Sequence, residues 1–340
     1  MNYDDCKPMV SVLMITYNHE KFIRQAIEGV LMQKVDFEYE LLIHDDASPD
    51  RTAEIIREYE AEYPKIVKPI YQTENQYSQG IDVSKFNRER AKGKYIASCE
   101  GDDYWIDPSK LQKLVNYLEQ HPEYICASHN VYVVGADGSR ISDKLHVYPI
   151  VPEYIYTKTD ADFSKHPGQS GSLVYHNLFC TMQDELLIAY NNLQMNGDIK
   201  LPVLLTQYGD IFCFSDVMGC YRKIMSASSS WTSQNYSKNR YAELHQNYIS
   251  LNQFTKKYFS YDQDNYELRF AVPIFSLLKY LRHPNRDNFM VFFCILNQTN
   301  ENIDIIRHLF QKLSKNPLGI IKNIHLLTQY WKFGRGKFTV

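Results

Sequence analysis

The stretch at residues 93–105 reads Gly-Lys-Tyr-Ile-Ala-Ser-Cys-Glu-Gly-Asp-Asp-Tyr-Trp. Its apolar half, from Tyr95 to Cys99, predicts a strand, and three acidic side chains follow it at once, Glu100, Asp102 and Asp103. Carboxylates crowded in this way repel one another, so such a group normally holds a cation or accepts hydrogen bonds. We therefore expect a binding site where this strand ends; the alternative is an acidic surface turn.

A sheet is expected around this strand. The run from Val10 to Thr16 is almost continuously β-forming, as in a buried parallel strand, and the runs from Tyr39 to His44 and from Ile66 to Tyr71 predict two more strands. Apolar residues at helical spacing lie between the strands and continue through residue 120. Strands that alternate with helices predict an α/β fold with a mostly parallel sheet.

A second acidic pair follows the strand from Tyr39 to His44, namely Asp45 and Asp46. In a sheet of this kind, ligands bind where the carboxyl ends of the strands open. We expect the two acidic groups to end neighbouring strands and to face one crevice. The alternative for Asp45 and Asp46 is a turn and the start of a helix, both of which Asp favours.

Composition narrows the class of protein. The chain has 340 residues, enough for one large domain with an appendage, and its net charge of −3 argues against nucleic-acid binding by charge. Its 7 cysteines show no zinc-site spacing, which indicates reduced thiols and a cytoplasmic protein. The first ten residues carry Asp4 and Asp5 and do not resemble a signal peptide. Later apolar runs are too short or too interrupted to span a bilayer.

Three motifs occur in order along the chain: Val10-Ser-Val-Leu-Met-Ile-Thr-Tyr-Asn18, Leu42-Ile-His-Asp-Asp-Ala-Ser48 and the stretch at 93–105. Together they resemble the large second family of glycosyltransferases, with the GT-A fold, through about Tyr124 and more loosely to Trp231. The resemblance implies a GT-A type, Rossmann-like, mostly parallel sheet flanked by helices, with a mainly helical C-terminal appendage. We expect a catalytic domain at 1–235 and a helical accessory region at 236–340, with a boundary loop near 226–240.

The resemblance also implies an activity. The chain would be an inverting glycosyltransferase that moves a sugar from a nucleotide-diphosphate sugar, with a UDP-sugar favoured, to an acceptor hydroxyl. The acceptor would be a glycan or a lipid-linked glycan, and the process cell-surface polysaccharide synthesis. Two alternatives stay open, a nucleotidyltransferase and a catalytically inactive nucleotide-sugar-binding protein. A dinucleotide-binding dehydrogenase is disfavoured because the sequence has no GxGxxG after a strand.

Donor-binding roles follow for matching positions. Thr16, Tyr17 and Asn18 would line the nucleoside pocket, although Tyr17 could equally be a core residue. Asp45 would accept a hydrogen bond from a pyrimidine, and Asp46 would support the turn or contact the ribose.

The acidic group at residues 100–103 corresponds to the metal motif of the family. Asp103 is the first choice for a ligand of Mn²⁺ or Mg²⁺, and Asp102 would bind the metal or the ribose, with Glu100 close by. Hard oxygen ligands favour these cations, and a cation there would stabilise the diphosphate leaving group.

Two later positions complete the implied site. Asp198, in Asn196-Gly-Asp198, resembles the acidic residue that acts as catalytic base; its alternative is a helix N-cap. Arg222 would clamp the diphosphate through its planar guanidinium, or would form a surface ion pair. The family often has a His near position 224, where this chain has Ile224. Lys223 or one of the serines at 226–230 could take that role.

Other residues are less specific. His129, His166 and His176 fall in the region that would face the acceptor, and the glycine-rich Gly168-Gln-Ser-Gly-Ser172 could border it or form only a turn.

The last segment of the chain is basic. After Asp304 it has no acidic residue, and apolar positions such as Leu309, Leu313 and Trp331 recur at roughly helical spacing. Such a segment predicts a possible contact with an anionic membrane, at the inner face of the cell membrane; the alternative is packing on the catalytic domain. Its basic residues are Arg307, Lys312, Lys315, Lys322, Lys332, Arg335 and Lys337.

Overall fold

A computed structural model describes residues 8–141, 150–162, 165–223, 241–262, 272–283 and 285–298. The chain divides into two compact units. The first comprises residues 1–158 and 166–237, and the second comprises 159–165 and 238–340. The boundary loop expected near 226–240 and the basic segment after Asp304 lie outside the described residues.

The described part of the first unit is built on a nine-stranded sheet with the order β3-β2-β1-β4-β8-β6-β9-β5, and β7 pairs with β9. Strands β3, β2, β1 and β4 are parallel, as are β6 and β9, whereas β8 runs antiparallel between β4 and β6. The bounds are β1 Val10–Thr16, β2 Tyr39–Asp45, β3 Val67–Tyr71, β4 Tyr95–Ser98, β5 Tyr104–Trp105, β6 Tyr124–Val134, β7 Tyr154–Tyr156, β8 Val174–His176 and β9 Asp210–Arg222.

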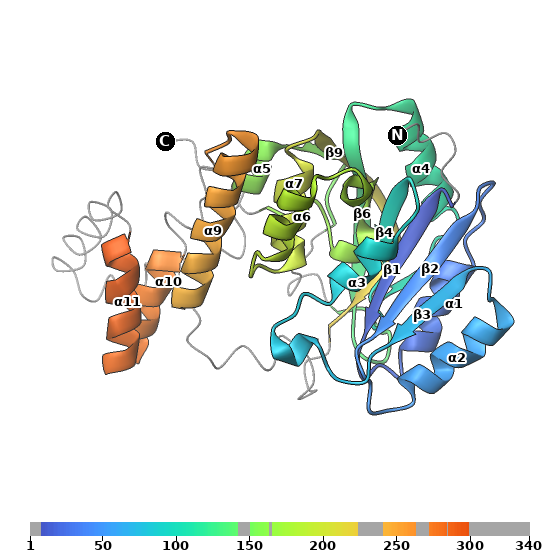
Figure 1. The fold of residues 1–340 in the computed structure, drawn as a ribbon, viewed down its shortest axis with the longest axis horizontal. Helices are drawn as coiled ribbons and strands as arrows, with labels where there is room; N and C mark the ends of the chain where they lie inside the picture. Colours follow the sequence, from blue (N-terminus) through green and yellow to red (C-terminus); the bar gives the residue numbers. More distant parts are fainter. Residues whose placement is uncertain are drawn as a thin grey trace. The chain divides into compact units, whose positions relative to one another are not determined.

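Helices alternate with the first strands and surround the sheet (Figure 1). In the first unit they are α1 Ile23–Leu31, α2 Thr52–Glu62, α3 Ser84–Arg90, α4 Lys110–Gln120, α6 Asp184–Asn191 and α7 Gly197–Leu205, with short 3₁₀ turns at Tyr77–Gln79, Ser170–Ser172 and Leu178–Cys180. The predicted α/β, GT-A type fold with a mostly parallel sheet is confirmed.

The second unit is helical over its described residues. It contains α9 Tyr241–Phe259, α10 Val272–Arg282 and α11 Arg286–Gln298, and most of the short helix α5 Lys158–Asp162 belongs to it. The hydroxyl of Tyr261, just after α9, donates to the carboxylate of Asp162 at 2.5 Å. The mainly helical C-terminal part is therefore also confirmed. Of the helices described, none is both long and apolar enough to cross a lipid bilayer.

The core of the first unit lies between the sheet and the apolar faces of its helices. In α1, the side chains of Ile23, Ala26, Ile27 and Val30 are fully buried, and they recur at the helical spacing seen in the sequence. Their burial in one cluster with the β1 side chains holds α1 on the sheet. The loop that joins β1 to α1 is thereby fixed at the carboxyl end of β1.

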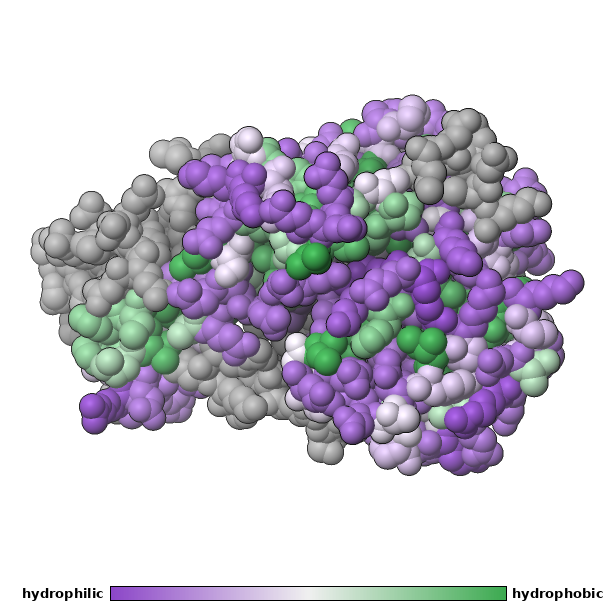
Figure 2. Space-filling view, in the orientation of Figure 1, coloured by the Kyte–Doolittle hydropathy of each residue, from purple (hydrophilic) through white to green (hydrophobic). Residues whose placement is uncertain are grey.

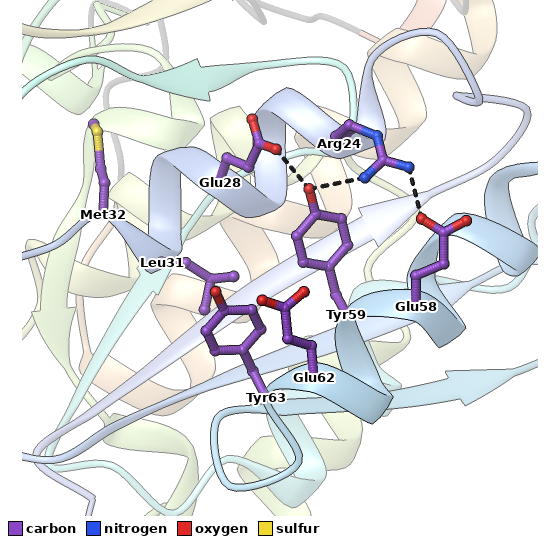
Figure 3. A pocket seen from close by; sticks show the side chains of 8 residues that line it. All are labelled: Arg24, Glu28, Leu31, Met32, Glu58, Tyr59, Glu62 and Tyr63. Carbon is purple, nitrogen blue, oxygen red and sulfur yellow. Dashed lines mark hydrogen bonds and ion pairs between the residues drawn. The ribbon is translucent and has the colours of Figure 1, made fainter.

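A shallow cavity of about 460 Å³ lies between α1 and α2, and Figure 3 shows the side chains that line it. The Tyr59 hydroxyl accepts a hydrogen bond from Arg24 and donates one to Glu28, while Arg24 also pairs with Glu58. None of the lining residues is one that the sequence assigns to the site. The polar side chains that line the cavity already pair with one another across it. We therefore interpret the cavity as a packing gap between two surface helices.

Asn87 ties the strand ends to α3. Its amide donates to the carbonyls of Met14 in β1 and Leu42 in β2, and its side-chain oxygen accepts from Arg90. The side chain is fully buried. Asn87 therefore satisfies main-chain groups of two neighbouring strands near the ends that carry the site residues.

We predict that Asn87→Ala lowers the free energy of unfolding by about 2 to 4 kcal/mol, because it leaves several buried polar groups without partners. Denaturant unfolding followed by circular dichroism measures the change. The matched control is Asn116→Ala, since Asn116 is exposed and its side-chain oxygen accepts a hydrogen bond from Gln112 on the same helix. A loss for Asn87→Ala no larger than for the control would contradict the assignment.

Candidate active site

The loops after β1 and β2 are joined by Ser48. Its hydroxyl accepts from the main-chain N–H of Asn18 at 2.9 Å and donates to a carboxylate oxygen of Asp45 at 2.5 Å. Asn18 adopts a φ of 60°, a left-handed conformation that Asn tolerates better than most residues. Thr16 is buried at the end of β1, whereas Tyr17 is 41% exposed. The structure thus brings all the residues predicted for the nucleoside pocket to one edge, with Tyr17 open to solvent.

Asp46 organises a turn. Its two carboxylate oxygens accept the main-chain N–H groups of Gln76 at 2.8 Å and Tyr77 at 3.0 Å, and its side chain is buried. Asp46 was expected either to support a turn or to contact the ribose. Its contacts show support of a turn, the one that follows β3.

The two acidic groups do not end neighbouring strands. Strand β1 lies between β2, which ends in Asp45, and β4, which precedes Glu100. Among the described residues, the one group of three or more possible metal ligands consists of Glu100, Asp102 and Asp103. The expectation of neighbouring strands was therefore wrong, because β1 pairs with both β2 and β4 and separates them in the sheet. Burial raises the pKa of Asp45, against the hydrogen bonds from Ser48 that lower it.

The acidic cluster is held together by hydrogen bonds. One oxygen of Asp103 accepts the Arg222 main-chain N–H at 2.7 Å, and the other accepts the Gln169 amide at 2.8 Å. Glu100 accepts the Ser170 hydroxyl at 2.9 Å. Asp103 is 3% exposed, whereas the side chain of Asp102 is 26% exposed. Asp102 is thus the more accessible of the two predicted metal ligands, whereas both carboxylate oxygens of Asp103 already accept hydrogen bonds.

The cluster has the chemistry of a cation site. The ligand atoms of Glu100, Asp102 and Asp103 lie within 4.8 Å of one another. Burial, and then the charge of Asp102, raises the pKa of Glu100 to about 7, and burial followed by the neighbouring carboxylates raises that of Asp103 well above its usual range. Negative charge is therefore concentrated without enough compensation, and a hard divalent cation such as Mn²⁺ or Mg²⁺ fits these oxygen ligands.

Gly101 lets the acidic loop approach β1. A Cβ atom at this position would lie 2.5 Å from the hydroxyl oxygen of Thr16 and 2.7 Å from its Cβ. The main-chain N–H of Gly101 donates to the carbonyl of Ile15 at 3.0 Å. The cluster and the predicted nucleoside residues are thus adjacent because residue 101 has no side chain.

Arg222 supports the cluster from within the protein. Its guanidinium donates to the carbonyls of Asp102 and Ala136 and to the side chain of Gln25, and it lies 4.5 Å from the Phe22 ring centroid. The residue is buried. These contacts differ from the predicted diphosphate clamp and from a surface ion pair. They hold the acidic loop against β9, and a contact with diphosphate would require these donors to be released.

Asp198 lies in the first turn of α7, after the helix-capping residue Asn196. One of its carboxylate oxygens is buried and has no hydrogen-bond partner in the described part of the chain. The charge of Asp198 contributes to the raised pKa of Glu100. Burial is the main cause of the raised pKa of Tyr221, and the charges of Asp103, Glu100, Asp102 and Asp198 add to it. Asp198 is therefore within electrostatic reach of the acidic cluster.

Three participants were not recognised in the sequence. Gln169 and Ser170 lie in the glycine-rich segment that was assigned to the acceptor region, yet they bond the acidic cluster. Tyr221 also received no role, although burial and the charges of the acidic cluster raise its pKa. The available signal was its position in the sequence next to Arg222, which was assigned to the site.

The remaining candidates divide between core and site. His129 and His176 lie on β6 and β8, and burial lowers the pKa of both. His166 bonds the main-chain oxygen of Asp198 at 3.2 Å. The main-chain N–H of Lys223 continues the pairing of β9 with β6. Ile224 and the serines at 226–230 lie outside the described residues.

A mostly parallel sheet with an acidic cluster at a strand end is the architecture of GT-A nucleotide-sugar transferases. Residues 11–177 match the model of glycosyl transferase family 2. TarS of S. aureus, solved in complex with UDP-GlcNAc, has a similar fold, with a TM-score of 0.53 and 18% identity over 85% of this chain and 80% of that one. The segment at residues 11–177 is therefore identified as a glycosyl transferase family 2 domain.

Curated relatives match parts of the chain. The Mycobacterium tuberculosis protein Rv1520 is 35% identical over 218 residues, which make up 63% of this chain and 58% of Rv1520. The putative teichuronic acid biosynthesis glycosyltransferase TuaG of Bacillus subtilis is 34% identical over 143 residues, 41% of this chain and 53% of TuaG. The chain thus spans little more than half the length of these relatives.

We predict that Gly101→Ala weakens the site more than the fold. The added methyl group must displace the acidic loop from Thr16, at a cost of about 1 to 3 kcal/mol. Calorimetric titration with UDP and with GDP, in Mn²⁺, should show nucleotide affinity reduced at least tenfold. The control is Gly219→Ala, where the nearest atoms would be at an ordinary 3.5 Å. Equal nucleotide affinity in Gly101→Ala and the control would contradict this account of Gly101.

Proposed function

We propose that this chain transfers a sugar from a nucleotide-diphosphate sugar to an acceptor hydroxyl, with inversion at the anomeric carbon. The observation that carries the proposal is the position of Asp198. It presents a buried carboxylate oxygen without a partner, within electrostatic reach of the cluster of Glu100, Asp102 and Asp103. A single displacement needs a base on the acceptor side and a stabilised leaving group on the donor side, and this arrangement supports both.

The donor half of the proposal rests on the loops after β1, β2 and β4. Thr16, Tyr17 and Asn18, with Asp45, would receive the nucleoside, and the exposed ring of Tyr17 offers a stacking surface. Asp102 and Glu100, with Asp103 behind them, would hold Mn²⁺ or Mg²⁺, which when bound supplies Lewis-acid stabilisation of the diphosphate. TarS, which shares the fold, was solved with UDP-GlcNAc, so UDP-sugars are the first donors to test.

The acceptor half rests on Asp198. As the hydroxyl attacks the anomeric carbon, its proton passes to a carboxylate oxygen of Asp198, and the sugar–phosphate bond breaks on the opposite face. General-base help of this kind contributes about 10²- to 10⁴-fold. The first unit, near the expected domain 1–235, would contain both halves, and the helical second unit would be accessory. The match to TuaG supports cell-surface polysaccharide synthesis as the process.

The matched test of this proposal compares donor binding with turnover. A panel of UDP-GlcNAc, UDP-glucose, UDP-galactose and GDP-mannose is assayed for nucleotide release in Mn²⁺ and in EDTA. For the best donor, Asp198→Asn should reduce turnover about 10²- to 10⁴-fold and leave nucleotide affinity unchanged, because only the base is lost. EDTA and Asp102→Asn should both weaken nucleotide binding.

Two results would reject parts of the proposal. Turnover of Asp198→Asn near the wild-type rate would return Asp198 to the role of a residue in the first turn of a helix. Nucleotide binding that is equal in Mn²⁺ and in EDTA would contradict the proposal that the site binds a divalent cation.

We also propose that the C-terminal part contacts an anionic membrane. Figure 2 shows hydrophobic residues gathered on α10 and α11, and in α11 the side chains of Phe289, Met290 and Phe293 are exposed. The basic segment after Asp304 follows this helix in the sequence. Apolar side chains next to lysines and arginines suit the interface of a bilayer that contains anionic lipids.

Vesicle sedimentation measures this contact. The full chain should sediment with phosphatidylglycerol-containing vesicles at low salt, much less at high salt, and not with neutral phosphatidylcholine vesicles, because screening weakens the attraction. Phe293→Ser should reduce sedimentation, whereas the exposed Ile188→Ser in α6 serves as the control. No sedimentation with anionic vesicles at low salt would end the proposal.

A further inference from the structure

A buried ionic cluster lies around Asp82, in the loop before α3. One carboxylate oxygen of Asp82 accepts the main-chain N–H of Ser84 at 3.1 Å and its hydroxyl at 2.5 Å. The other oxygen accepts Nη2 of Arg88 and Nζ of Lys200, both at 2.9 Å. Although burial alone would raise it, the charges of Arg88 and Lys200 hold the pKa of Asp82 well below its usual range. Asp82 is thus ionised and fixed on both oxygens.

Lys200 carries this cluster to α7. It lies two residues after Asp198 on the same helix, is 2% exposed, and also donates to the carbonyl of Leu193 at 3.3 Å. Its Nζ is 4.8 Å from the centroid of the buried Tyr190 ring. A buried ammonium group must keep its partners, so the position of Lys200 is set by Asp82, which is 118 residues away in the chain.

Arg88 fixes the segment that leads into α7. The same Nη2 that meets Asp82 also donates to the side-chain oxygen of Asn191 at 2.9 Å, at the last residue of α6. Its guanidinium lies 5.2 Å from the Phe179 ring and 5.6 Å from the Tyr190 ring. The short connection from α6 to α7 is therefore held at both ends by side chains on and before α3 (Figure 1).

The main chain of Asp198 has an anchor of its own. Pro202 lies four residues later in α7 and has no N–H, so the Asp198 carbonyl lacks its helical partner. His166 bonds that carbonyl at 3.2 Å through Nδ1, which must donate because a carbonyl oxygen only accepts. Asp198 is thus held through its main chain and through the helix that carries it, while one carboxylate oxygen stays without a partner.

Buried ion pairs of this kind add little net stability, because desolvation offsets their attraction; what they supply is a fixed geometry. We propose that Asp82 and Lys200 form a positioning pair that fixes the Asp198 carboxylate against the acidic cluster. The inference rests on the proposed function, in which Asp198 is the base. It makes Lys200 a positioning residue that acts through Asp198, and it links the loop before α3 to the proposed base.

Lys200→Met tests the pair, because methionine retains most of the volume and leaves Asp82 paired with Arg88. We expect kcat with the best donor of the panel to fall about 10- to 100-fold, as a displacement of about 1 Å produces. The donor KM and the UDP affinity should not change. Hydrogen exchange should increase in peptides covering residues 191–205 and nowhere else in the first unit.

The matched control is Lys94→Met. Lys94 is also a largely buried lysine paired with a carboxylate, Glu119 at 2.7 Å, but it precedes β4 at the end remote from Glu100. Its kcat and the exchange of residues 191–205 should equal those of the wild type. If Lys200→Met fails to fold, Asn191→Ala loosens the same segment and keeps the ion pair; it should lower kcat several-fold at constant KM.

A double variant separates this inference from the proposed function. If Lys200 acts through Asp198, adding Lys200→Met to Asp198→Asn should cause no further loss of kcat. An inactive Asp198→Asn together with a Lys200→Met that retains at least half of the wild-type kcat would overturn the positioning role and leave the function standing. An active Asp198→Asn would overturn the function itself.

Discussion

The buried carboxylate of Asp103 is the point on which the site depends. A buried carboxylate needs hydrogen-bond partners, and here one oxygen accepts from the Gln169 amide and the other accepts from the main-chain N–H of Arg222. These bonds fasten three distant segments to each other: the loop after β4, the segment at 168–172 and the end of β9. Arg222 strengthens the junction by donating also to the carbonyl of Asp102.

This junction explains why the side chain of Asp102 stays partly exposed, at 26%. Because Asp103 and Arg222 fix the loop, the adjacent carboxylate can face solvent in a defined direction, beside the residues that follow β1. Gly101 makes that proximity possible, since any side chain would collide with Thr16. On the other side, α7 is held by its own buried contacts, so that Asp198 approaches the same cluster from a part of the chain with no share in nucleoside binding.

The sequence predicted what depends on local pattern. The run Val10–Thr16 is β1 as expected, and α1 buries the apolar residues that its spacing selected. The order of strands could not be predicted, because pairing is decided by contacts remote in sequence, and β1 came to lie between the two acidic groups.

The hydrogen-bond partners of single polar residues could not be predicted from the sequence either. Gln169 bonds a residue 66 positions away, and Arg222 reaches Asp102 across 120. Neither partner can be inferred from its neighbours in the chain. Of the site residues that the resemblance implied, the structure places Thr16, Asp102 and Asp198 in positions that suit the proposed chemistry, and it gives Asp46 and Arg222 supporting contacts within the protein.

The most direct test of the account is the stereochemistry of turnover. Proton NMR of the anomeric signal, recorded in the first minutes after the best donor of the panel is mixed with the enzyme and Mn²⁺, shows the configuration of the released or transferred sugar before it equilibrates. An α-linked donor should give a β product, because a single displacement with Asp198 as base inverts the anomeric carbon. An α product at early times would contradict that mechanism.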